Sequence, residues 1–306
     1  MKIPYYPGCT LKSVAKNFET SALAVAKILG LELVELPRWN CCGTVFSLTT
    51  DDLMHQLAPI RNLIRVQEMN EKGIVENNYR LVTLCTMCFN TLKRSNLFVK
   101  KNPDKLETMN SLMDREEDYK GKVEVYHFLE ILREIGFDKI GEKVKNPLKN
   151  LKVAPYYGCL MLRPEEIGID SPVKPTILEN LIEVLGAEVV DFPFKTRCCG
   201  SYQTVNRKEL VAELTFDILN QARMEDAECV VLSCPLCAFN LDNRQAEVKQ
   251  LHPNFKMMPV LYFTQLMAVA FGLDEKVYGF EFNYVNPRPL FMEKNLLKIG
   301  VETLKR

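Results

Sequence analysis

The chain has 306 residues, of which 47% are hydrophobic, and it carries 39 basic and 39 acidic side chains. This length and composition allow a large buried core in one or two domains. The balanced charge excludes the strongly basic proteins that bind nucleic acids or anionic membrane surfaces. The most apolar stretch, residues 257–273, is interrupted by polar residues, so we expect no membrane span.

The first residues lack the apolar run of a secretory signal, so we expect a cytoplasmic protein. Disulfides are rare in that compartment, and the chain has eleven cysteines. These cysteines are therefore interpreted as metal ligands or redox groups.

Short apolar runs alternate along the chain with segments of helical length. In the first half we predict strands at 2–7, 31–36, 80–84 and 123–126, with a helix at 15–30 after the first of them. This alternation predicts an α/β fold with mostly parallel sheets and helices on their faces. Ligands gather at the carboxyl ends of parallel strands, where several of the cysteines fall.

The second half of the chain repeats the first. Residues 3–9 (IPYYPGC) return as 153–159 (VAPYYGC), and residues 81–85 (LVTLC) return as 230–234 (VVLSC). A repeat this long predicts two pseudo-symmetric Rossmann-like units. The predicted division is residues 1–145, residues 151–273 and a C-terminal arm at 274–306. The arm is expected to pack on the body or on a partner chain.

Ten cysteines fall into two sets with one order: a lone cysteine, an adjacent pair followed by glycine, and a C-x-x-C motif. The first set is Cys9, Cys41, Cys42, Cys85 and Cys88. The second set is Cys159, Cys198, Cys199, Cys234 and Cys237. The eleventh, Cys229, precedes an apolar run and is interpreted as a small core residue.

Several kinds of site use cysteine in such patterns. Structural zinc takes four ligands and would leave one thiol of each set idle, while a dithiol redox site needs only the C-x-x-C motif. Unreactive buried cysteines would not recur at matched positions. An iron–sulfur cluster bound by more than four thiolates would use a complete set. We favour iron–sulfur clusters, and zinc in at least one set stays open.

The doubled pattern of a lone cysteine, CCG and C-x-x-C resembles the cysteine-rich CCG domain. Two such domains in one chain are similar to the B subunit of heterodisulfide reductase, over residues 2–273. The resemblance implies that all ten cysteines of the two sets are metal ligands, each set binding one noncubane [4Fe-4S] cluster. It also implies reduction of a disulfide to two thiols, which would take place between the two units.

The same resemblance implies two partner proteins in a complex. They are a ferredoxin-like iron–sulfur subunit and a flavin-containing subunit, similar to the C and A subunits of heterodisulfide reductase. The chain has no dinucleotide-binding motif of its own, so partners must supply its electrons. No nucleic-acid partner is expected.

The residues after the cysteine pairs differ from the methanogen pattern, in which proline follows the first pair and several glycines the second. Here the pairs are followed by Gly43-Thr44 and by Gly200-Ser201. The resemblance implies the mixed disulfide of coenzyme M and coenzyme B as substrate, but these departures leave a related disulfide, for example on a small protein, equally open.

An alternative function is an electron-relay or anchor subunit with CCG domains. Such subunits occur in complexes of the glycolate or lactate oxidase type and of the succinate dehydrogenase/fumarate reductase type. A membrane anchor should show an exposed amphipathic helix, for which residues 257–273 are the best candidates. We expect a strand followed by a core helix there instead.

Three further side chains and one segment carry expectations. Arg38 and Arg197 lie close to the cysteine pairs and are candidates for holding an anionic substrate. His127 stands among apolar neighbours and is interpreted as a core histidine rather than a catalytic acid. The charged segment 99–122, present in the first unit alone, is predicted to be a solvated helical connection.

Overall fold

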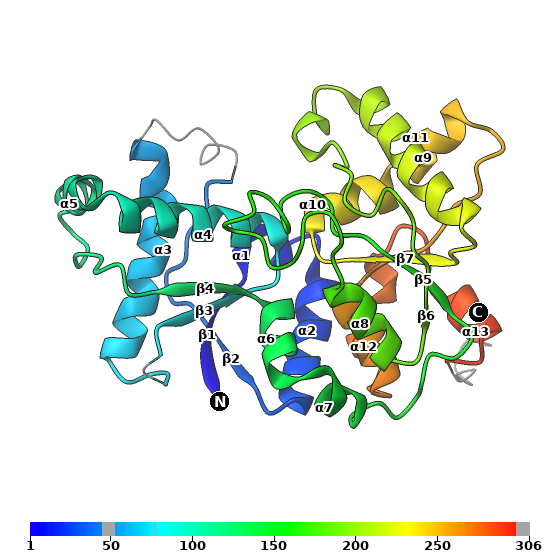
Figure 1. Ribbon diagram of the computed structural model, residues 1–306, viewed down its shortest axis with the longest axis horizontal. Coiled ribbons are helices and arrows are strands. Elements are labelled where there is room, and N and C mark those ends of the chain that lie inside the picture. Colours follow the sequence, from blue (N-terminus) through cyan, green and yellow to red (C-terminus); the bar gives the residue numbers. More distant parts are fainter. Residues whose placement is uncertain (45–52, 77, 298–306) are drawn as a thin grey trace, which may run out of the picture.

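The computed structural model describes residues 1–44, 53–76 and 78–297. Each half of the chain contains one four-stranded sheet in which every strand pairs in parallel (Figure 1). The strands of the first sheet are β1 (Lys2–Tyr6), β2 (Glu32–Glu35), β3 (Arg80–Thr83) and β4 (Glu124–His127). Those of the second are β5 (Lys152–Pro155), β6 (Glu188–Val189), β7 (Cys229–Leu232) and β8 (Val260–Tyr262).

The two sheets have the same topology. Their strand orders are β2-β1-β3-β4 and β6-β5-β7-β8, so the first strand of each half lies beside the third. The predicted α/β class with two parallel-sheet units is confirmed, and the four predicted strands of the first half are all present. Parallel strands need crossover connections, which the helices provide.

The helices of the first half are α1 (Gly8–Leu11), α2 (Lys16–Ile28), α3 (Leu53–Glu71), α4 (Thr86–Lys101), α5 (Pro103–Leu112), α6 (Phe128–Ile135) and α7 (Phe137–Gly141). Those of the second half are α8 (Ile177–Val184), α9 (Lys208–Met224), α10 (Pro235–Ala238), α11 (Gln245–Leu251), α12 (Phe263–Ala270) and α13 (Arg288–Glu293). A π-helix, η2 (Phe239–Asn243), continues α10, and 3₁₀ turns are η1 (Ser201–Gln203), η3 (Glu275–Val277) and η4 (Phe280–Phe282).

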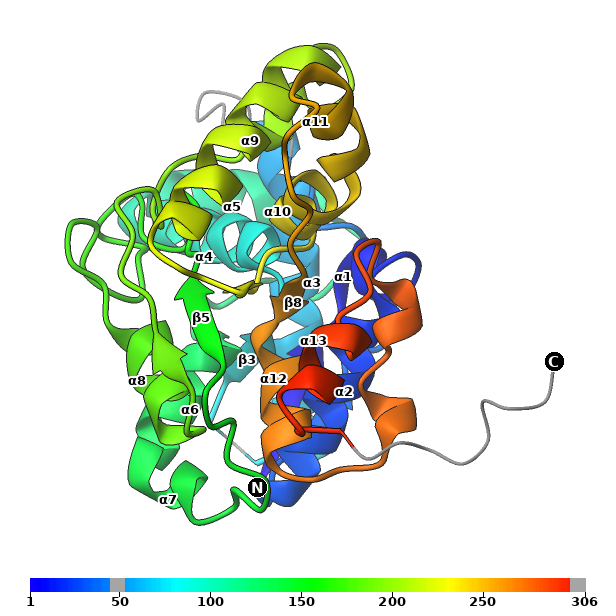
Figure 2. The ribbon, with the colours of Figure 1, turned by 90° about the vertical axis from the view of Figure 1, so that its right-hand side faces the viewer.

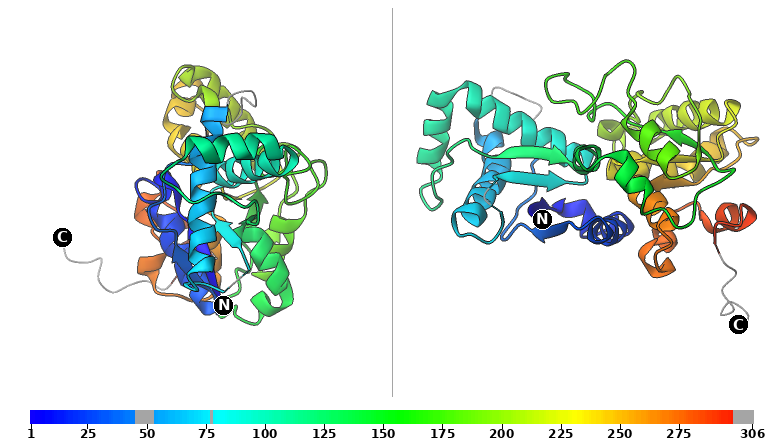
Figure 3. Two further views of the ribbon diagram at one scale, coloured as in Figure 1. Left: turned by 90° about the vertical axis from the view of Figure 1, so that its left-hand side faces the viewer. Right: turned by 60° about the horizontal axis from the view of Figure 1, so that its bottom comes forward.

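The two halves are joined through helices that lie between the sheets. In Figures 1 and 3, α2 of the first half and α12 of the second lie in this central layer. The ring of Phe18 stacks on that of Tyr262 with centroids 4.2 Å apart, and the hydroxyl groups of Ser21 and Thr264 are 2.7 Å apart. Full burial of Phe18 contributes about 1.5–3 kcal/mol to the stability of this contact.

The apolar stretch 257–273 forms β8 and α12, and every residue of α12 is buried. This confirms the predicted strand and core helix, and leaves no exposed amphipathic helix in that segment. Among the residues that the structure describes, no helix is long and apolar enough to cross a membrane.

The charged segment 99–122 is helical in part and mostly exposed, as predicted, but it also makes specific contacts with the first unit. It begins with the end of α4 and forms α5, but Glu116 pairs with Arg61 and Arg65 of α3. The Arg65 guanidinium lowers the pKa of Glu116 to about 2. Tyr119 is buried and donates to Asn96 Oδ1 (2.6 Å). The segment therefore packs on the first unit through specific contacts that charge patterning alone does not reveal.

The C-terminal arm packs on the body as far as the structure describes it. Figure 2 shows its turns and α13 beside α2 and α12. Gln265 Nε2 donates to the Tyr278 carbonyl (2.7 Å), and Asn283 Nδ2 donates to that of Val260 (2.7 Å). The prediction left body and partner open, and residues 274–297 lie on the body. Residues 298–306 lie outside the described range.

Candidate metal centres

Three segments in each half carry the cysteines to the carboxyl edge of its sheet. Cys9 lies in α1, directly after β1, and Cys85 precedes α4, directly after β3. Since β1 and β3 are neighbours in the sheet, the two segments start side by side. Cys159 and Cys234 follow β5 and β7 of the second sheet in the same way.

Burial of the thiols follows one pattern in both sets. The second cysteine of each pair and both cysteines of each C-x-x-C motif are buried, whereas the lone cysteine and the first of the pair are at least partly exposed. Cys42 Sγ and Cys88 Sγ are 3.5 Å apart, and Cys199 Sγ and Cys237 Sγ are 3.3 Å apart. Each unit thus brings sulfur atoms together from segments far apart in sequence.

Hydrogen bonds between neighbouring thiols shift their pKa values in opposite directions. The bond between Cys159 and Cys198 lowers the pKa of Cys198 to about 6 and raises that of Cys159. In the first set, the bond between Cys9 and Cys41 raises the pKa of Cys9. The thiolate is the form in which cysteine binds metals, and the lowered pKa of Cys198 favours that form. No group of three or more His, Cys, Asp or Glu side chains in the described residues is arranged around a single metal ion.

The two cysteine sets meet at the interface between the halves. A hydrogen bond with Cys234 raises the pKa of Cys85. The pKa of Cys234 is lowered, mainly by its hydrogen bond with Cys237 and to a smaller extent by that with Cys85. Beside them, Thr86 Oγ1 and Ser233 Oγ are 2.5 Å apart and buried. Equivalent positions of the repeat thus face each other, as a pseudo-two-fold arrangement requires.

Buried polar side chains hold the two CCG loops in matched ways. Tyr6 donates to the carbonyl of Asn40 (2.9 Å), and Tyr156 donates to that of Arg197 (2.6 Å), so each tyrosine fixes the residue before a cysteine pair. In the second loop, Asn240 Nδ2 also donates to the Cys199 carbonyl (2.9 Å). Bonds of this kind define the positions of the cysteine side chains before any ligand binds.

Two glycines bring the backbone close to the sulfur atoms. Gly8 and Gly158 have φ values of +73° and +66°, a conformation that favours glycine. A Cβ atom added at Gly8 would lie 3.0 Å from Cys88 Sγ, and one added at Gly158 would lie 3.2 Å from Cys237 Sγ. Neither position has room for a side chain beside the thiols.

The structure pairs both predicted substrate-binding arginines with carboxylates. Arg38 Nη2 lies 2.6 Å from Glu68 Oε2, and Arg197 Nη2 lies 2.9 Å from Asp217 Oδ2. The guanidinium of Arg197 also lies over the Phe194 ring. Their charges are therefore partly neutralised by the protein itself.

His127 and Cys229 lie in the core. His127 Nδ1 accepts from the Leu129 N–H (3.2 Å), so its Nε2–H donates to the Leu84 carbonyl (2.9 Å), and burial lowers its pKa to about 4. The ring is neutral and positions the residue before Cys85. Cys229 is fully buried in β7, and burial raises the pKa of its thiol.

Arg94 is a nearby cation that the sequence did not single out. It lies on α4 of the first unit, forms no ion pair within the described residues, and its charge acts on Tyr202 in the second unit. Burial and the thiols of Cys159 and Cys234 raise the pKa of Tyr202 to about 12. Arg94 lies four residues after Asn90, so the sequence could have placed both on one face of α4. The sequence could not show that this face meets the second unit.

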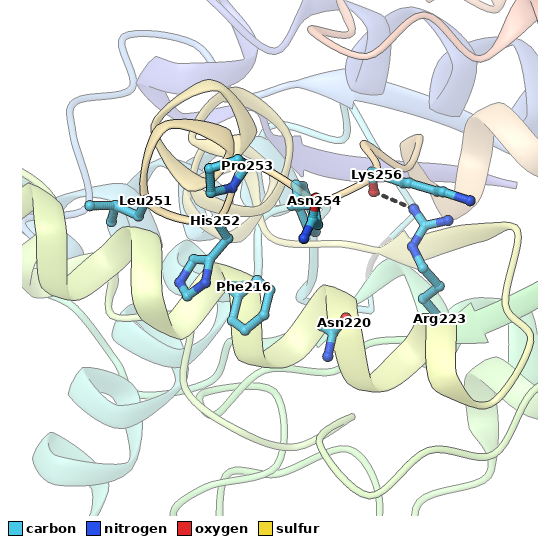
Figure 4. Close-up of a pocket in the computed structure, with 9 residues that line it drawn as sticks. Phe216, Asn220, Arg223, Leu251, His252, Pro253, Asn254 and Lys256 are labelled. Carbon is cyan, nitrogen blue, oxygen red and sulfur yellow. Dashed lines mark hydrogen bonds between the residues drawn. The ribbon is translucent and has the colours of Figure 1, made fainter.

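A cavity of about 590 Å³ lies far from the cysteines, between α9 and α11 (Figure 4). His252 stacks on Phe216 with ring centroids 3.7 Å apart, and Arg223 donates to the carbonyls of Lys256 and Met257. No cysteine lines this cavity, so we do not assign it to the metal centres.

Fold and site together define a class: α/β proteins built from two copies of a parallel-sheet unit, each with five cysteines at its carboxyl edge. The model of the cysteine-rich CCG domain matches residues 3–93 and 153–242. The chain therefore belongs to the CCG family, as the sequence motifs predicted.

Two curated relatives align over nearly the whole chain. One is the membrane anchor subunit of 8-methylmenaquinol:fumarate reductase from Wolinella succinogenes, 33% identical over 94% of this chain and 98% of the relative. Another is the B subunit of the ferredoxin/F420H2-dependent CoB-CoM heterodisulfide reductase from Methanosarcina acetivorans, 28% identical over 93% of this chain and 94% of the relative.

A solved structure shares the fold. It is a hypothetical protein from Helicobacter pylori, with a TM-score of 0.70 and 12% sequence identity over 92% of this chain. The matched region spans about half of that protein, 51% of its chain.

Proposed function

We propose that the chain is the iron–sulfur subunit of a multisubunit oxidoreductase and that it reduces a disulfide to two thiols. The observation that carries this proposal is the contact of the two C-x-x-C motifs at the interface of the two units, where Thr86 Oγ1 and Ser233 Oγ, beside Cys85 and Cys234, are 2.5 Å apart. A relative of this chain is named as the B subunit of a CoB-CoM heterodisulfide reductase, which supports it.

The donor set fits an iron–sulfur centre in each unit. Five thiols of each unit come from three segments, and Gly8 and Gly158 leave the space beside the sulfur atoms free. Cys9, Cys41, Cys42, Cys85 and Cys88 would hold one cluster, and Cys159, Cys198, Cys199, Cys234 and Cys237 the other. When bound, one noncubane [4Fe-4S] cluster in each set would supply the electrons of the reaction.

Reduction of one disulfide takes up two electrons and two protons and releases two thiols. The chain itself would hold its two halves, and with them the two cysteine sets, in fixed positions relative to each other. The Thr86–Ser233 and Ser21–Thr264 hydrogen bonds join the halves. Two partners, one ferredoxin-like and one containing flavin, would deliver the electrons. Arg38 and Arg197 remain candidates for an anionic substrate group, although each already has a carboxylate partner.

The test is an anaerobic assay of the full chain with a reduced viologen as electron donor. We expect two thiols to appear for each disulfide consumed, with the coenzyme M–coenzyme B disulfide or with the oxidised form of a small dithiol protein. A chain that carries both clusters but reduces neither substrate would contradict the proposal.

A second candidate is an electron-relay or anchor subunit of a fumarate reductase type complex. The relative from Wolinella succinogenes, 33% identical over 94% of this chain, favours it. The chain would then pass electrons without reducing a disulfide, and no thiol would appear in the assay above.

A matched pair of glycine substitutions tests the fit of the first cysteine set. Gly8 and Gly30 have similar φ values, +73° and +76°, but a Cβ atom at Gly30 would meet nothing within 4 Å. Both Gly8→Ala and Gly30→Ala should lose about 1–2 kcal/mol of stability from backbone strain. Gly8→Ala alone should also bind less iron, because its methyl group presses on the Cys88 sulfur. Equal iron contents in the two variants would show that this contact is not needed.

A further inference from the structure

The cavity between α9 and α11 lies at a place that the first unit fills with its own chain. The helices that follow the two CCG loops, α3 and α9, can be aligned through the glycines of those loops. A Cβ atom added at Gly43 would lie 3.5 Å from Ala58 Cβ, and one added at Gly200 would lie 2.8 Å from Leu214 Cδ1. Ala58 therefore corresponds to Leu214. By the same alignment, the α9 residues that line the cavity, Phe216, Asn220 and Arg223, correspond to Ile60, Ile64 and Gln67 of α3.

In the first unit, this face of the helix is covered by the charged segment that follows α4. Ile60, Ile64 and Gln67 are fully buried. The Gln67 side chain donates to the Asp118 carbonyl (3.0 Å) and accepts from the Lys120 N–H (2.9 Å), so the segment uses both ends of its amide. The chain itself therefore closes this face and satisfies its polar group.

The second unit has a shorter connection at this place. Residues 102–123 join α4 to β4, whereas only residues 252–259 join α11 to β8. The equivalent residues Phe216, Asn220 and Arg223 are therefore partly exposed and line the cavity. They are spaced by four and three residues, so they form one face of α9. The cavity is thus the space that the charged segment occupies in the first unit.

Arg223 stands where the first unit has the neutral Gln67, and its charge has no counter-ion. It forms no ion pair within the described residues, and burial alone lowers its pKa. Its Nη2 donates to the carbonyls of Lys256 and Met257, which fixes the guanidinium at the cavity. Its Nε is buried without a hydrogen-bond partner among the described residues, and none of the residues that line the cavity is acidic. A partly buried cation without a counter-ion costs stability, which an anionic ligand would restore.

The lining changes from cationic to apolar along the cavity (Figure 4). Arg223 and Lys256 lie at one end, and Lys256 is exposed and has no ion-pair partner in the described part of the chain. Phe216 and Leu251 lie toward the other end, where the Phe216 ring makes an edge contact with the buried Phe255, with centroids 6.0 Å apart. These walls suit a ligand with an anionic group and an aromatic body. The volume of about 590 Å³ is that of a usual small-molecule site, about 300–1,000 Å³.

The surroundings of the cavity favour a carboxylate as the anionic group. The carboxylate of Glu213 lies 2.9 Å from His252 Nε2, at the apolar end, so the anionic group belongs at the other end. Helix α9 ends at Met224 and α11 ends at Leu251, and no lining residue begins a helix. The cavity therefore lacks the N–H groups of a helix N-terminus that phosphate sites use. A carboxylate has two oxygen atoms and needs fewer donors.

We propose that this cavity binds a small aromatic carboxylate, with its carboxylate group at Arg223 and Lys256 and its ring along Phe216 and Leu251. The ligand takes the place of the charged segment of the first unit and supplies the counter-ion that Arg223 lacks. This inference goes beyond disulfide reduction and electron transfer and depends on neither, because no cysteine lines the cavity. Its test measures binding rather than turnover.

The experiment is calorimetric titration of the anaerobically purified full chain with 2-naphthoate. We expect one binding site, and binding about 10- to 150-fold weaker in Arg223→Gln, the equivalent of one hydrogen bond to a charged group. Lys256 is exposed, so Lys256→Gln should fold normally and weaken binding up to about 5-fold. The matched control, Arg207→Gln, removes the same charge from the exposed start of α9 and should leave Kd unchanged. Thermal unfolding of each variant checks that it is folded.

Three further ligands separate the contributions of charge and ring. 2-Naphthamide has the same ring without the charge, so its weaker binding should be equal in the parent chain and in Arg223→Gln. Fumarate, which has carboxylates but no ring, and 2-naphthyl phosphate should both bind more weakly than 2-naphthoate. The proposal is overturned if 2-naphthoate does not bind, or if Arg223→Gln binds it as tightly as the parent chain. It is also overturned if Arg223→Gln weakens binding of the amide equally, if Arg207→Gln has the same effect as Arg223→Gln, or if fumarate or the phosphate binds more tightly.

Discussion

Replacing Cys41 or Cys198 by serine is expected to abolish disulfide reduction by the anaerobically prepared chain. The two cysteines are equivalent members of the two sets, and both are exposed at the carboxyl edge of their sheet. Because the reaction takes up two electrons and each cluster would pass one at a time, a chain with one intact set could not deliver both electrons together. The expected loss is therefore the same for either variant, rather than graded between them.

The control for this prediction is Cys229→Ser. Cys229 belongs to neither set and lies fully buried in β7. A buried serine hydroxyl without a partner costs about 1–3 kcal/mol, so the variant should unfold more easily but turn over at the parent rate. Thiol release, measured per chain, distinguishes the cases. If either set can be removed with turnover largely intact, the unit that contains it is structural and the symmetrical role of the two sets is wrong.

Iron content is the second large expected effect. Two [4Fe-4S] clusters correspond to about eight iron atoms per chain. We expect a brown protein with that content, and the double variant Cys199→Ser/Cys237→Ser, which removes two sulfur atoms 3.3 Å apart, should retain about four. The corresponding variant of the first set, Cys42→Ser/Cys88→Ser, should lose the other half. Metal analysis by mass spectrometry gives both numbers.

This experiment also decides between the metals that the cysteine pattern left open. A colourless protein with stoichiometric zinc would contradict iron–sulfur centres in both sets. Zinc in one set and iron in the other would restrict redox chemistry to a single unit, which would remove the basis for two-electron reduction between the units. Cys229→Ser should keep the full iron content and serves as the control again.

Much of the architecture was predictable from the sequence because its causes are local. Apolar runs such as 80–84 alternate with helical segments, and this periodicity is enough to predict parallel strands with helical crossovers. The duplication predicted two equivalent sheets, which the structure contains. The position of Cys9 and Cys85 directly after strands follows from the same local pattern. The CCG and C-x-x-C motifs are also local in sequence, and they identified the family.

The segment 99–122 marks the limit of such reasoning. Its charge run indicated a solvated connection, and most of its residues are exposed, but the sequence did not show that Glu116 is bound by Arg65 of α3 or that Tyr119 is buried. Charge patterning reports how polar a segment is. Which charged side chain finds a partner depends on where another helix lies, and no local pattern contains that information.

By itself, the sequence determined the two cysteine sets, their order along the chain and the strand ends at which they lie. Only the tertiary structure decided how the two units face each other. The packing of α2 on α12 accompanies the contact of Thr86 with Ser233 beside the two C-x-x-C motifs, and Asn90 of the first unit donates to the Leu160 carbonyl of the second. The physical reason is the range of the interactions. Strand and helix formation depend on neighbours within a few residues, whereas these contacts join side chains separated by 70 residues or more in sequence.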